Sequence, residues 1–235
     1  MNFESLKLHP AIMDGLRAMR YTAPTLLQSL AIPPALEGRD VIGLGRNGAG
    51  KTAACALAIL QRLRAVEKEG VRALVVSPES ESAESALELI NSFGENIGLE
   101  STGIYEGVSI EKQLRALRYR PAIIIASPGR LMDHLWKGSV KLMDLEILAI
   151  DDADSLLEAG FLAEIRNILG YIGHPHQTLL FSASLPDGLR RFIKESLHDP
   201  VTVQGDRSLP ENRGTSTRDR LEHYLKSLQW KNHSR

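Results

Sequence analysis

Short apolar runs alternate along this chain with longer segments that have the periodicity of amphipathic helices. Five of the runs are rich in β-branched residues and apolar at nearly every position; they span residues 40–44, 73–77, 122–127, 146–151 and 178–184. Strands that are apolar on both faces are typical of a parallel sheet buried between helices. A sixth run, residues 200–204, predicts a last strand.

The segments between these runs place their apolar residues at helical spacing. Helices are predicted within residues 50–70, 79–98, 109–119, 128–138, 158–172 and 185–197. Regular alternation of strands and helices predicts an α/β domain with a mostly parallel sheet and helices on both faces. We assign this domain to residues 1–204.

Residues 205–235 differ in composition from the rest of the chain. The first part, to residue 217, is rich in Gly, Ser, Pro and Arg, as linkers are. The remainder is basic and amphipathic, and its apolar residues share one face: Leu221, Tyr224, Leu225 and Leu228. We therefore expect a polar linker and a basic amphipathic tail, and favour a loosely attached tail over a docked helix.

Composition and charge exclude several classes of protein. The 235 residues, 43% hydrophobic and 24% charged, are typical of a globular domain. The formal net charge of −1 provides no overall basic field, so any polyanion site has to be local. One cysteine, Cys55, excludes an internal disulfide and a zinc site built from cysteines. No leader pattern and no apolar run near the ~20 residues of a membrane span are present, so we expect a cytoplasmic protein without membrane contact.

The sequence GRNGAGKT, residues 45–52, lies between the first predicted strand and the first predicted helix. It fits the phosphate-binding pattern G-x-x-x-x-G-K-[ST] in the strand–loop–helix context that this pattern requires. Its glycines let successive N–H groups point at phosphate oxygens, and the helix N-terminus adds its dipole. Lys51 is expected to reach the β- and γ-phosphates, and Thr52 to hold Mg²⁺. A nucleoside triphosphate with Mg²⁺ is the predicted ligand.

Three aspartates stand in the sequence LAIDDADSLLEAGF, residues 148–161, where the fourth buried run ends. An acid at that point presents its carboxylate at the carboxyl edge of the sheet, where open α/β folds bind ligands. Asp151 is therefore predicted to hold Mg²⁺, with capping of the following helix as the alternative. For Asp152 and Asp154 capping is a stronger competitor.

Several motifs, in this order along residues 3–203, resemble those of the DEAD-box ATP-dependent RNA helicases. RYTAPTLLQ (20–28) resembles the Q motif, GRNGAGKT the phosphate loop, SPGR (127–130) the T-P-G-R, DDAD (151–154) the D-E-A-D and SAS (182–184) the S-A-T. Phe3 has the spacing of the family's isolated upstream aromatic residue. The resemblance implies a P-loop NTPase fold, that of the N-terminal RecA-like domain of such a helicase.

The resemblance also implies a role for each matching position. ATP would contact Phe3, Tyr21, Gln28, Asn47, Gly48, Ala49, Gly50, Lys51 and Thr52, and Mg²⁺ would contact Thr52 and Asp151. Gln28 would select adenine and Phe3 would stack on it; a surface glutamine and a core aromatic are the alternatives. Asp152 and Lys51 would carry catalysis. Asp154, Ser182 and Ser184 would couple the nucleotide site to RNA, with helix capping as the alternative for Ser182.

RNA, single-stranded or duplex, would contact Pro78, Gly107, Ser127, Gly129 and Arg130, although Arg130 could instead be an ordinary helix-surface cation. Three departures from the family pattern fall on this surface. Ser80 stands where the family has arginine, Glu79 replaces its threonine, and Glu106 replaces the first glycine of its G-G. Because acids repel a polyanion, we expect weak RNA binding.

Asp152 stands where the family places a glutamate that polarises the attacking water. One methylene fewer removes roughly 1.3–1.5 Å of reach, and a misplacement of about 1 Å can cost on the order of 10²-fold in rate. No segment after residue 204 is long enough for the second RecA-like domain, whose arginines are typically worth roughly 10³–10⁵-fold. We expect binding of nucleotide with weak hydrolysis.

Two functions remain open. The first is the ATP-binding first domain of a DEAD-box-like RNA helicase, which couples ATP binding and hydrolysis to RNA binding or remodelling and needs a second RecA-like domain for full activity. The alternative is a stand-alone helicase-like module that binds nucleotide or a protein partner without turnover. The complete nucleotide motifs favour the first, and the basic tail slightly favours the second.

Overall fold

The computed structural model describes residues 2–65, 68–173 and 175–205. The predicted tail therefore lies outside the described residues. The helices are a 3₁₀ turn, Phe3–Leu6, followed by α1 Pro10–Ala18, α2 Leu26–Leu36, α3 Lys51–Leu63, α4 Ser80–Gly94, α5 Ile110–Leu117, α6 Pro128–Trp136, α7 Ala153–Glu158, α8 Leu162–Leu169 and α9 Asp187–Ser196. The strands are β1 Val41–Leu44, β2 Ala73–Val76, β3 Ser101–Ile104, β4 Ile123–Ala126, β5 Ile147–Ile150, β6 Gln177–Ser182 and β7 Val201–Gln204.

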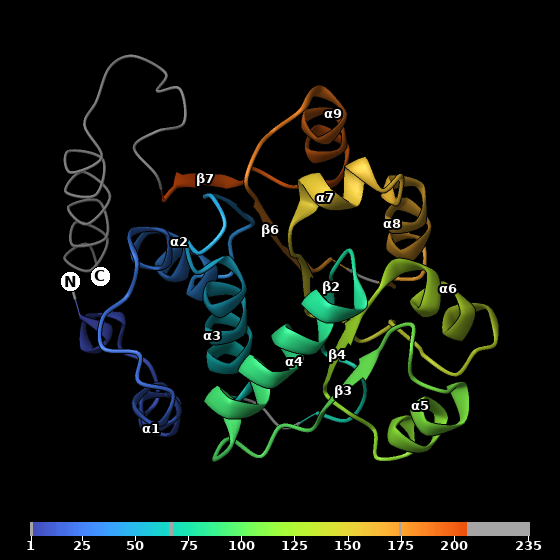
Figure 1. Cartoon of the computed structure of the whole chain (residues 1–235), viewed down its shortest axis with the longest axis horizontal. Coiled ribbons are helices and arrows are strands. Elements are labelled where there is room, and N and C mark those ends of the chain that lie inside the picture. Colours follow the sequence, from blue (N-terminus) through green and yellow to red (C-terminus); the bar gives the residue numbers. More distant parts are fainter. Residues whose placement is uncertain (1, 66–67, 174, 206–235) are drawn as a thin grey trace.

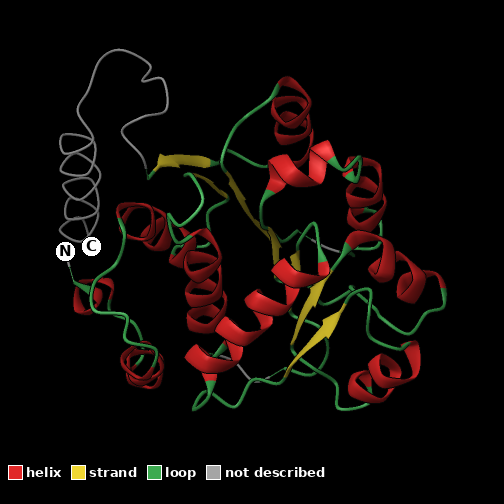
Figure 2. Ribbon diagram, viewed as in Figure 1, coloured by secondary structure: helices red, strands yellow, loops and turns green. Residues whose placement is uncertain are grey.

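These strands form one sheet in the order β3-β4-β2-β5-β6-β1-β7. Each neighbouring pair is parallel. Helices α1 to α4 lie on one side of the sheet and α6 to α9 on the other (Figure 1), and Figure 2 shows the strands as a twisted layer between the two groups. The arrangement confirms the predicted α/β fold with helices on both faces.

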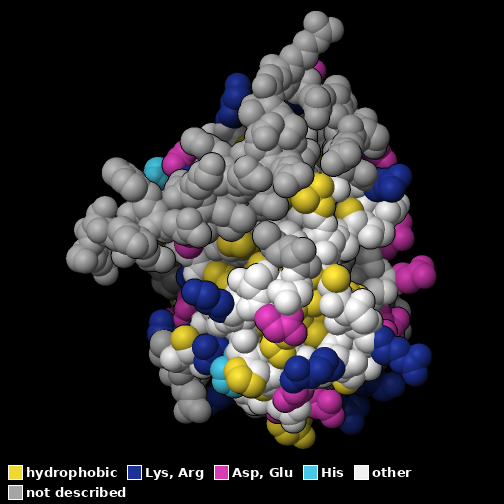
Figure 3. Space-filling model, turned by 90° about the vertical axis from the view of Figure 1, so that its left-hand side faces the viewer, with side chains coloured by type: hydrophobic (Ala, Val, Ile, Leu, Met, Phe, Trp, Pro, Cys, Tyr) yellow, Lys and Arg dark blue, Asp and Glu magenta, His cyan; other side chains and the backbone are white. Residues whose placement is uncertain are grey.

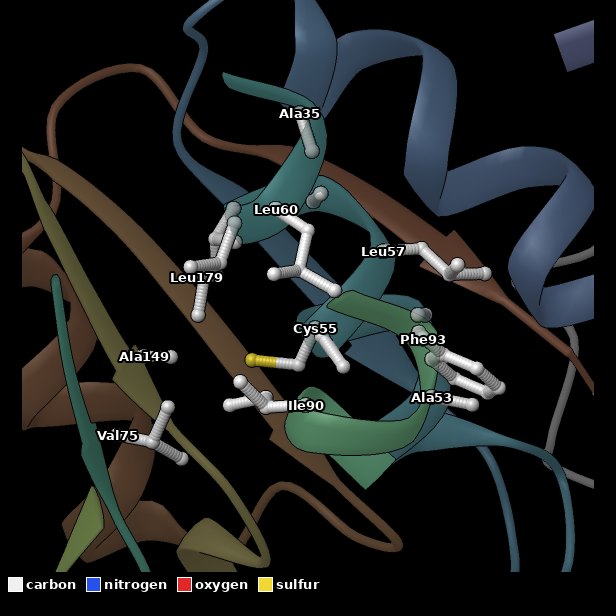
Figure 4. Packing of buried hydrophobic residues seen from close by; sticks show 14 of the residues in the cluster. Ala35, Ala53, Cys55, Leu57, Leu60, Val75, Ile90, Phe93, Ala149 and Leu179 are labelled. Carbon is white, nitrogen blue, oxygen red and sulfur yellow. The ribbon is translucent and has the colours of Figure 1, made fainter. Parts of the chain in front are cut away.

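Alternate strand residues supply two separate hydrophobic clusters. On one face, residues of β2, β5 and β6 pack against α3 and α4, as Figure 4 shows for Val75, Ala149, Leu179, Cys55, Leu60, Ile90 and Phe93. Their strand neighbours Leu74, Leu148 and Leu180 join the second cluster, with α6 to α9. Successive strand side chains point to opposite faces, so each run that is apolar at every position is buried on both.

Of the two edge strands of the sheet, β7 was predicted from the sequence and β3 was not. β7 matches the sixth run and pairs with β1. β3, which pairs with β4, was not predicted. Its sequence, STGI, contains two hydroxyl residues and a glycine, and only Ile104 is buried. An edge strand that is only half covered does not need an apolar run.

The helix predicted within residues 158–172 is confirmed as α8, Leu162–Leu169, but it begins later than the pattern indicated because the chain turns at Gly160. That residue has a φ of +84°, in the left-handed region that glycine adopts without steric cost. Helix α7 therefore ends at Glu158, and α8 begins at Leu162. Apolar residues of both helices, including Leu156 and Ile165, pack into the same cluster, which explains why the apolar pattern runs through the break.

Apart from Phe3 and the Q motif, which precede β1, the predicted site segments lie at the carboxyl ends of strands. The phosphate loop follows β1, Asp151 follows β5, Ser127 follows β4, and Ser182 is the last residue of β6. Because the strands are parallel, these ends lie along one edge of the sheet. The start of β1 is fixed at the opposite edge by Asp40, whose carboxylate accepts backbone N–H groups of Thr178 and His198, both at 2.7 Å.

The surface carries charges of both signs. On the face drawn in Figure 3, Lys and Arg side chains are interspersed with Asp and Glu side chains, as the formal net charge of −1 leads one to expect. In the part of the chain that the structure describes, no helix has both the length and the apolar character needed to cross a membrane.

Candidate functional site

The phosphate loop joins β1 to α3 through two glycines in the left-handed region. Gly48 and Gly50 both have a φ of +82°. Because Gly50, the N-cap of α3, has no side chain, the first turn of the helix presents bare backbone N–H groups. Such groups, together with the helix dipole, attract phosphate oxygens. The local geometry is therefore that of an anion site.

Lys51 begins α3 and turns its side chain back over this loop. Its ammonium donates to the carbonyl oxygen of Gly45 at 3.2 Å and to Oδ1 of Asn47 at 3.4 Å. It also lies 3.0 Å from Oδ1 of Asp152. The lysine thus connects the loop after β1 with the end of β5.

A cavity of about 380 Å³ opens beside Lys51. Its walls come from the phosphate loop, the start of α3, and single residues of three other segments: Tyr21, Asn47, Gly48, Gly50, Lys51, Thr52, Ala53, Leu89 and Asp152. The structure therefore gathers most of the predicted nucleotide contacts around one space.

Asp151 lies at the floor of the site, with only 2% of its surface exposed. Its Oδ2 accepts a hydrogen bond from the Thr52 hydroxyl at 2.6 Å, whereas Oδ1 is buried without a hydrogen-bond partner in the described chain. Burial, and secondly the charge of Asp152, raise the pKa of Asp151 to about 6 against the opposing effects of Thr52 and Lys51. A buried carboxylate with one free oxygen beside a hydroxyl fits a divalent cation, and Mg²⁺ commonly takes one carboxylate with phosphate and water oxygens.

Asp152 has an unusual backbone conformation. Its φ of +50° and ψ of +54° lie in the left-handed region, which costs a residue with a side chain roughly 1–2 kcal/mol. This conformation lets consecutive aspartates separate: Asp151 points into the interior, and the side chain of Asp152 is 33% exposed and faces Lys51.

Asp154 joins the ends of β5 and β6. Its Oδ2 accepts hydrogen bonds from the backbone N–H and the hydroxyl of Ser184, at 3.0 and 3.1 Å, and its own N–H donates to the Ser182 hydroxyl at 3.1 Å. Burial pushes the pKa of Asp154 upward, but hydrogen bonds from Ser182, Ala183 and Ser184 outweigh it, so this pKa lies below its ordinary value. The residues predicted to couple the site to RNA are therefore in direct contact.

Gln28 lies behind the phosphate loop and is 1% exposed, so it is not a surface glutamine. Its Oε1 accepts the Thr25 N–H at 2.9 Å, and its Nε2 donates to the carbonyl oxygen of Gly50 at 3.2 Å. The Thr25 hydroxyl donates to the carbonyl oxygen of Ala49 at 2.7 Å. The N-terminal cap of α2 thereby holds two carbonyl groups of the phosphate loop.

Phe3 is 2% exposed and belongs to the hydrophobic core. It also lines a second cavity, of about 250 Å³, whose walls include Arg20 and Tyr21. Tyr21 borders both cavities, and its ring meets that of Phe93 edge-on at 5.2 Å between centroids. The two cavities thus adjoin at Tyr21: one is lined mainly by the phosphate loop and the start of α3, and the other includes aromatic and arginine side chains.

The predicted RNA contacts lie at the N-terminus of α6 and on the neighbouring loops. Pro78 follows β2, Gly107 follows β3, and Ser127 is the N-cap of α6. The Ser127 hydroxyl donates to the carboxylate of Glu106. Arg130 turns inward, donating to the carbonyl oxygen of Val108 at 3.0 Å, and its side chain is only 17% exposed.

A family model described as DEAD/DEAH box helicase matches residues 25–192, which is more than half of the chain. The chain belongs to the DEAD/DEAH box helicase family. It is 39% identical over 203 residues to the ATP-dependent RNA helicase DeaD of Buchnera aphidicola subsp. Acyrthosiphon pisum, covering 86% of this chain and 34% of that protein. It is 37% identical over 204 residues to the DEAD-box ATP-dependent RNA helicase CshA of Streptococcus pneumoniae serotype 4, covering 87% and 39%.

The chain thus spans about a third of the length of these curated helicases. Among solved structures it is similar to a hypothetical ATP-dependent RNA helicase from Sulfolobus tokodaii, with a TM-score of 0.77 and 31% identity over 84% of this chain and 57% of that one. This likeness confirms the RecA-like fold that the motifs implied.

Two features of this helicase-family site were not predicted. Gln113 is 2% exposed and links the loop before α5 to α6: its Nε2 donates to the Tyr105 carbonyl oxygen at 2.7 Å, and its Oε1 lies 2.8 Å from Nε2 of His134. No sequence signal marks a buried glutamine within an amphipathic helix. The bridge from Thr25 to the phosphate loop was also missed, although T-x-x-Q in residues 25–28 fits a capping box.

Proposed function

We propose that this chain is the ATP-binding first domain of a DEAD-box RNA helicase, which couples ATP binding and hydrolysis to RNA binding. The observation that carries the proposal is the convergence of Lys51, Thr52 and Asp152 on one cavity at the carboxyl edge of the sheet, with Asp151 bonded to Thr52. The domain comprises residues 1–204, including the Q motif. RNA as the partner and the cytoplasm as the location belong to the same proposal.

ATP binds with its phosphates on the loop of residues 45–52 in this account. The N–H groups at the start of α3 and the ammonium of Lys51 neutralise the β- and γ-phosphates. Mg²⁺ would be held by Asp151, through its unpartnered Oδ1, and by the Thr52 hydroxyl, and it would supply further neutralisation of phosphate charge. Thr52 and Asp151 already face each other, so little rearrangement of either is needed.

Adenine lies in the cavity beside Tyr21 in the same proposal, with Phe3 and Arg20 in its walls. Gln28, the residue proposed to select adenine, lies behind the phosphate loop, where its carboxamide bonds to the Gly50 carbonyl group and to the start of α2. The second amide hydrogen and the second lone pair of this carboxamide are the groups by which it can read an adenine edge.

Asp152 is the residue that orients the attacking water. Its carboxylate is held by Lys51 at 3.0 Å, and with one methylene fewer than the family's glutamate it reaches less far toward a water beyond the γ-phosphate. We therefore assign slow hydrolysis to this domain by itself. Full turnover requires a second RecA-like domain that brings arginines to the site, as arginine fingers do in phosphoryl transfer.

Coupling to RNA runs through Asp154, Ser182 and Ser184 in this proposal. Asp152 and Asp154 flank the start of α7, and Asp154 is bonded to the end of β6. A shift of Asp152 on nucleotide binding is thereby passed to the segment after β6. This link is short and made of charged hydrogen bonds, which are about twice as strong as neutral ones.

The alternative function, a nucleotide- or partner-binding module without turnover, is favoured by the shortness of Asp152 and by the acid Glu106 among the RNA contacts. An ATPase assay separates the two. ATP hydrolysis would be measured for the chain with and without single-stranded RNA, alone and mixed with the second RecA-like domain of a related helicase. The Lys51→Ala variant and the exposed-site variant Lys141→Ala serve as matched controls.

The helicase proposal predicts slow hydrolysis by the chain alone and RNA-stimulated hydrolysis in the mixture, abolished by Lys51→Ala and unaffected by Lys141→Ala. ATP binding without hydrolysis in either setting would establish the binding module instead. Fast hydrolysis by the chain alone, independent of RNA, would contradict both.

A further inference from the structure

A carboxylate of the chain itself lies across the first turn of α6. Glu106, in the loop after β3, accepts a hydrogen bond from the Ser127 hydroxyl through Oε2. Its other oxygen, Oε1, lies 3.4 Å from the position that a Cβ atom on Gly129 would occupy. One carboxylate oxygen therefore lies beside Ser127, which is itself buried, and the other beside Gly129; both residues are proposed RNA contacts.

The start of α6 is a favourable place for a negative group. Ser127 is the N-cap, but its side chain does not cap the helix, and Pro128 follows at the first helical position. The N–H groups of the first turn are thus left to other acceptors, and the helix dipole favours an anion there. The Glu106 carboxylate lies beside this turn, bonded to the Ser127 hydroxyl, at a place that also favours a phosphate group of RNA.

The loop that carries Glu106 is held on both sides by an interior hydrogen-bond network. Nε2 of Gln113 donates to the carbonyl oxygens of Tyr105 and Val108, at 2.7 and 3.3 Å. Oε1 of Gln113 is in turn 2.8 Å from Nε2 of His134, which is buried. Glu106 lies between the two anchored carbonyl groups, so the fold fixes the backbone of this loop, and the exposed side chain of Glu106 extends from it.

Arg130 strengthens the same arrangement. Its guanidinium donates to the Val108 carbonyl oxygen at 3.0 Å and to Oε1 of Gln113 at 3.4 Å. A cation that could have been offered to RNA instead helps to fasten the loop that presents Glu106. The proposed RNA contacts thus have the carboxylate of Glu106 beside them, while the guanidinium of Arg130 is bonded to Val108 and Gln113.

We propose that Glu106 is an internal competitor for a backbone phosphate of RNA, so that RNA reaches the N-terminus of α6 only when Glu106 leaves Ser127. The inference rests on the proposed RNA-binding function and names the residue that limits it. Removing the carboxylate should therefore add about one phosphate contact. For single-stranded RNA one contact changes the slope of log K against log salt by about 0.7.

The test is a titration of fluorescently labelled single-stranded RNA with the whole chain at several salt concentrations, read by anisotropy. The variants are Glu106→Ala, Glu106→Gln and Glu95→Gln, an exposed glutamate just beyond α4 that changes net charge equally. Glu106→Ala and Glu106→Gln should each tighten RNA binding at least about fivefold and steepen the salt slope by about 0.7. Glu95→Gln should change neither. An equal gain in Glu95→Gln, or no gain at position 106, would overturn the proposal.

A fourth variant, Ser80→Arg, separates this inference from the proposed function. It restores a cation on the neighbouring surface and leaves Glu106 in place. If Ser80→Arg gains RNA affinity and neither Glu106 variant does, the RNA surface stands and the role of Glu106 is refuted. If none of the variants binds RNA while all still bind ATP, the RNA-binding function itself is refuted. Unchanged melting temperatures confirm that the variants are folded.

Discussion

The ammonium of Lys51 lies 3.0 Å from the carboxylate of Asp152, and the pair bridges the loop after β1 and the end of β5. Lys51 is 6% exposed and Asp152 33% exposed, so this ion pair is partly shielded from water. The two residues proposed for catalysis are thus held against each other. In the proposed function an incoming γ-phosphate would compete with Asp152 for the lysine, which would link nucleotide binding directly to the position of the acid proposed to orient water.

The first prediction concerns the length of residue 152. Asp152→Glu restores roughly 1.5 Å of reach, and since about 1 Å of misplacement can cost on the order of 10²-fold, we expect kcat to rise roughly 10- to 100-fold. The rise should appear only with the second RecA-like domain present, and ATP affinity should change little. Steady-state kinetics check this, with Asp187→Glu on the surface of α9 as the control. An unchanged kcat in the two-domain mixture would remove Asp152 from the water-orienting position.

The second prediction concerns the metal. Asp151→Asn removes the carboxylate charge but keeps the size of the side chain, so it should abolish the gain in ATP affinity that Mg²⁺ provides. The measurement is ATP affinity with Mg²⁺ and with EDTA. The ratio should be large in the wild type and near one in the variant, and Asp144→Asn should behave as the wild type. If Mg²⁺ raises the ATP affinity of Asp151→Asn as much as that of the wild type, Asp151 is excluded as a Mg²⁺ ligand.

The third prediction is a pH dependence from Asp154, whose pKa is lowered in the folded chain because its hydrogen bonds outweigh burial. A lowered pKa stabilises the fold above the ordinary value near 4, and the stabilisation is lost as pH falls through the folded-state pKa. Asp154→Asn should therefore lower the free energy of unfolding by about 1–3 kcal/mol at pH 7. Urea unfolding should show that this deficit shrinks below about pH 4. A deficit that stays constant with pH would assign the effect to packing alone.

The fourth prediction compares two glycines of similar backbone conformation. Gly50 and Gly98 have φ values of +82° and +76°, but a Cβ on Gly50 would lie 2.3 Å from Nε2 of Gln28, whereas one on Gly98 would meet nothing within 4 Å. Gly98→Ala should lose about 1 kcal/mol from backbone strain. Gly50→Ala should lose more and should also lose ATP binding, because the contact between Gln28 and the phosphate loop is displaced. Equal losses of unfolding free energy in the two variants, measured by urea unfolding, would show that the Gln28 side chain moves aside without an energetic cost.

The sequence predicted those parts of the fold that depend on local pattern. Strands buried on both faces, such as Ala73–Val76 and Ile147–Ile150, need apolar residues at every position, and the phosphate loop needs its glycines and lysine in a fixed order. Asp151 was placed correctly at a strand end because a parallel sheet brings such ends to one edge.

Other features depend on contacts between distant residues, which local pattern does not encode. Helix α2 was not predicted because it is buried almost all round and contains Pro33 and Pro34, so no amphipathic period marks it. Glu106 was noticed as an acid on the RNA side, but its hydrogen bond to Ser127 joins two strand ends 21 residues apart. The burial of Gln28 likewise follows from the approach of α2 to the phosphate loop.

The central claim, an ATP site built around Lys51, is tested most directly by calorimetric titration of the chain with ATP and GTP in the presence of Mg²⁺. The account predicts that ATP binds at least about tenfold more tightly than GTP, a difference of about 1.4 kcal/mol, and that Lys51→Ala abolishes both signals while Lys141→Ala preserves them. Equal affinities for ATP and GTP that survive Lys51→Ala would contradict it.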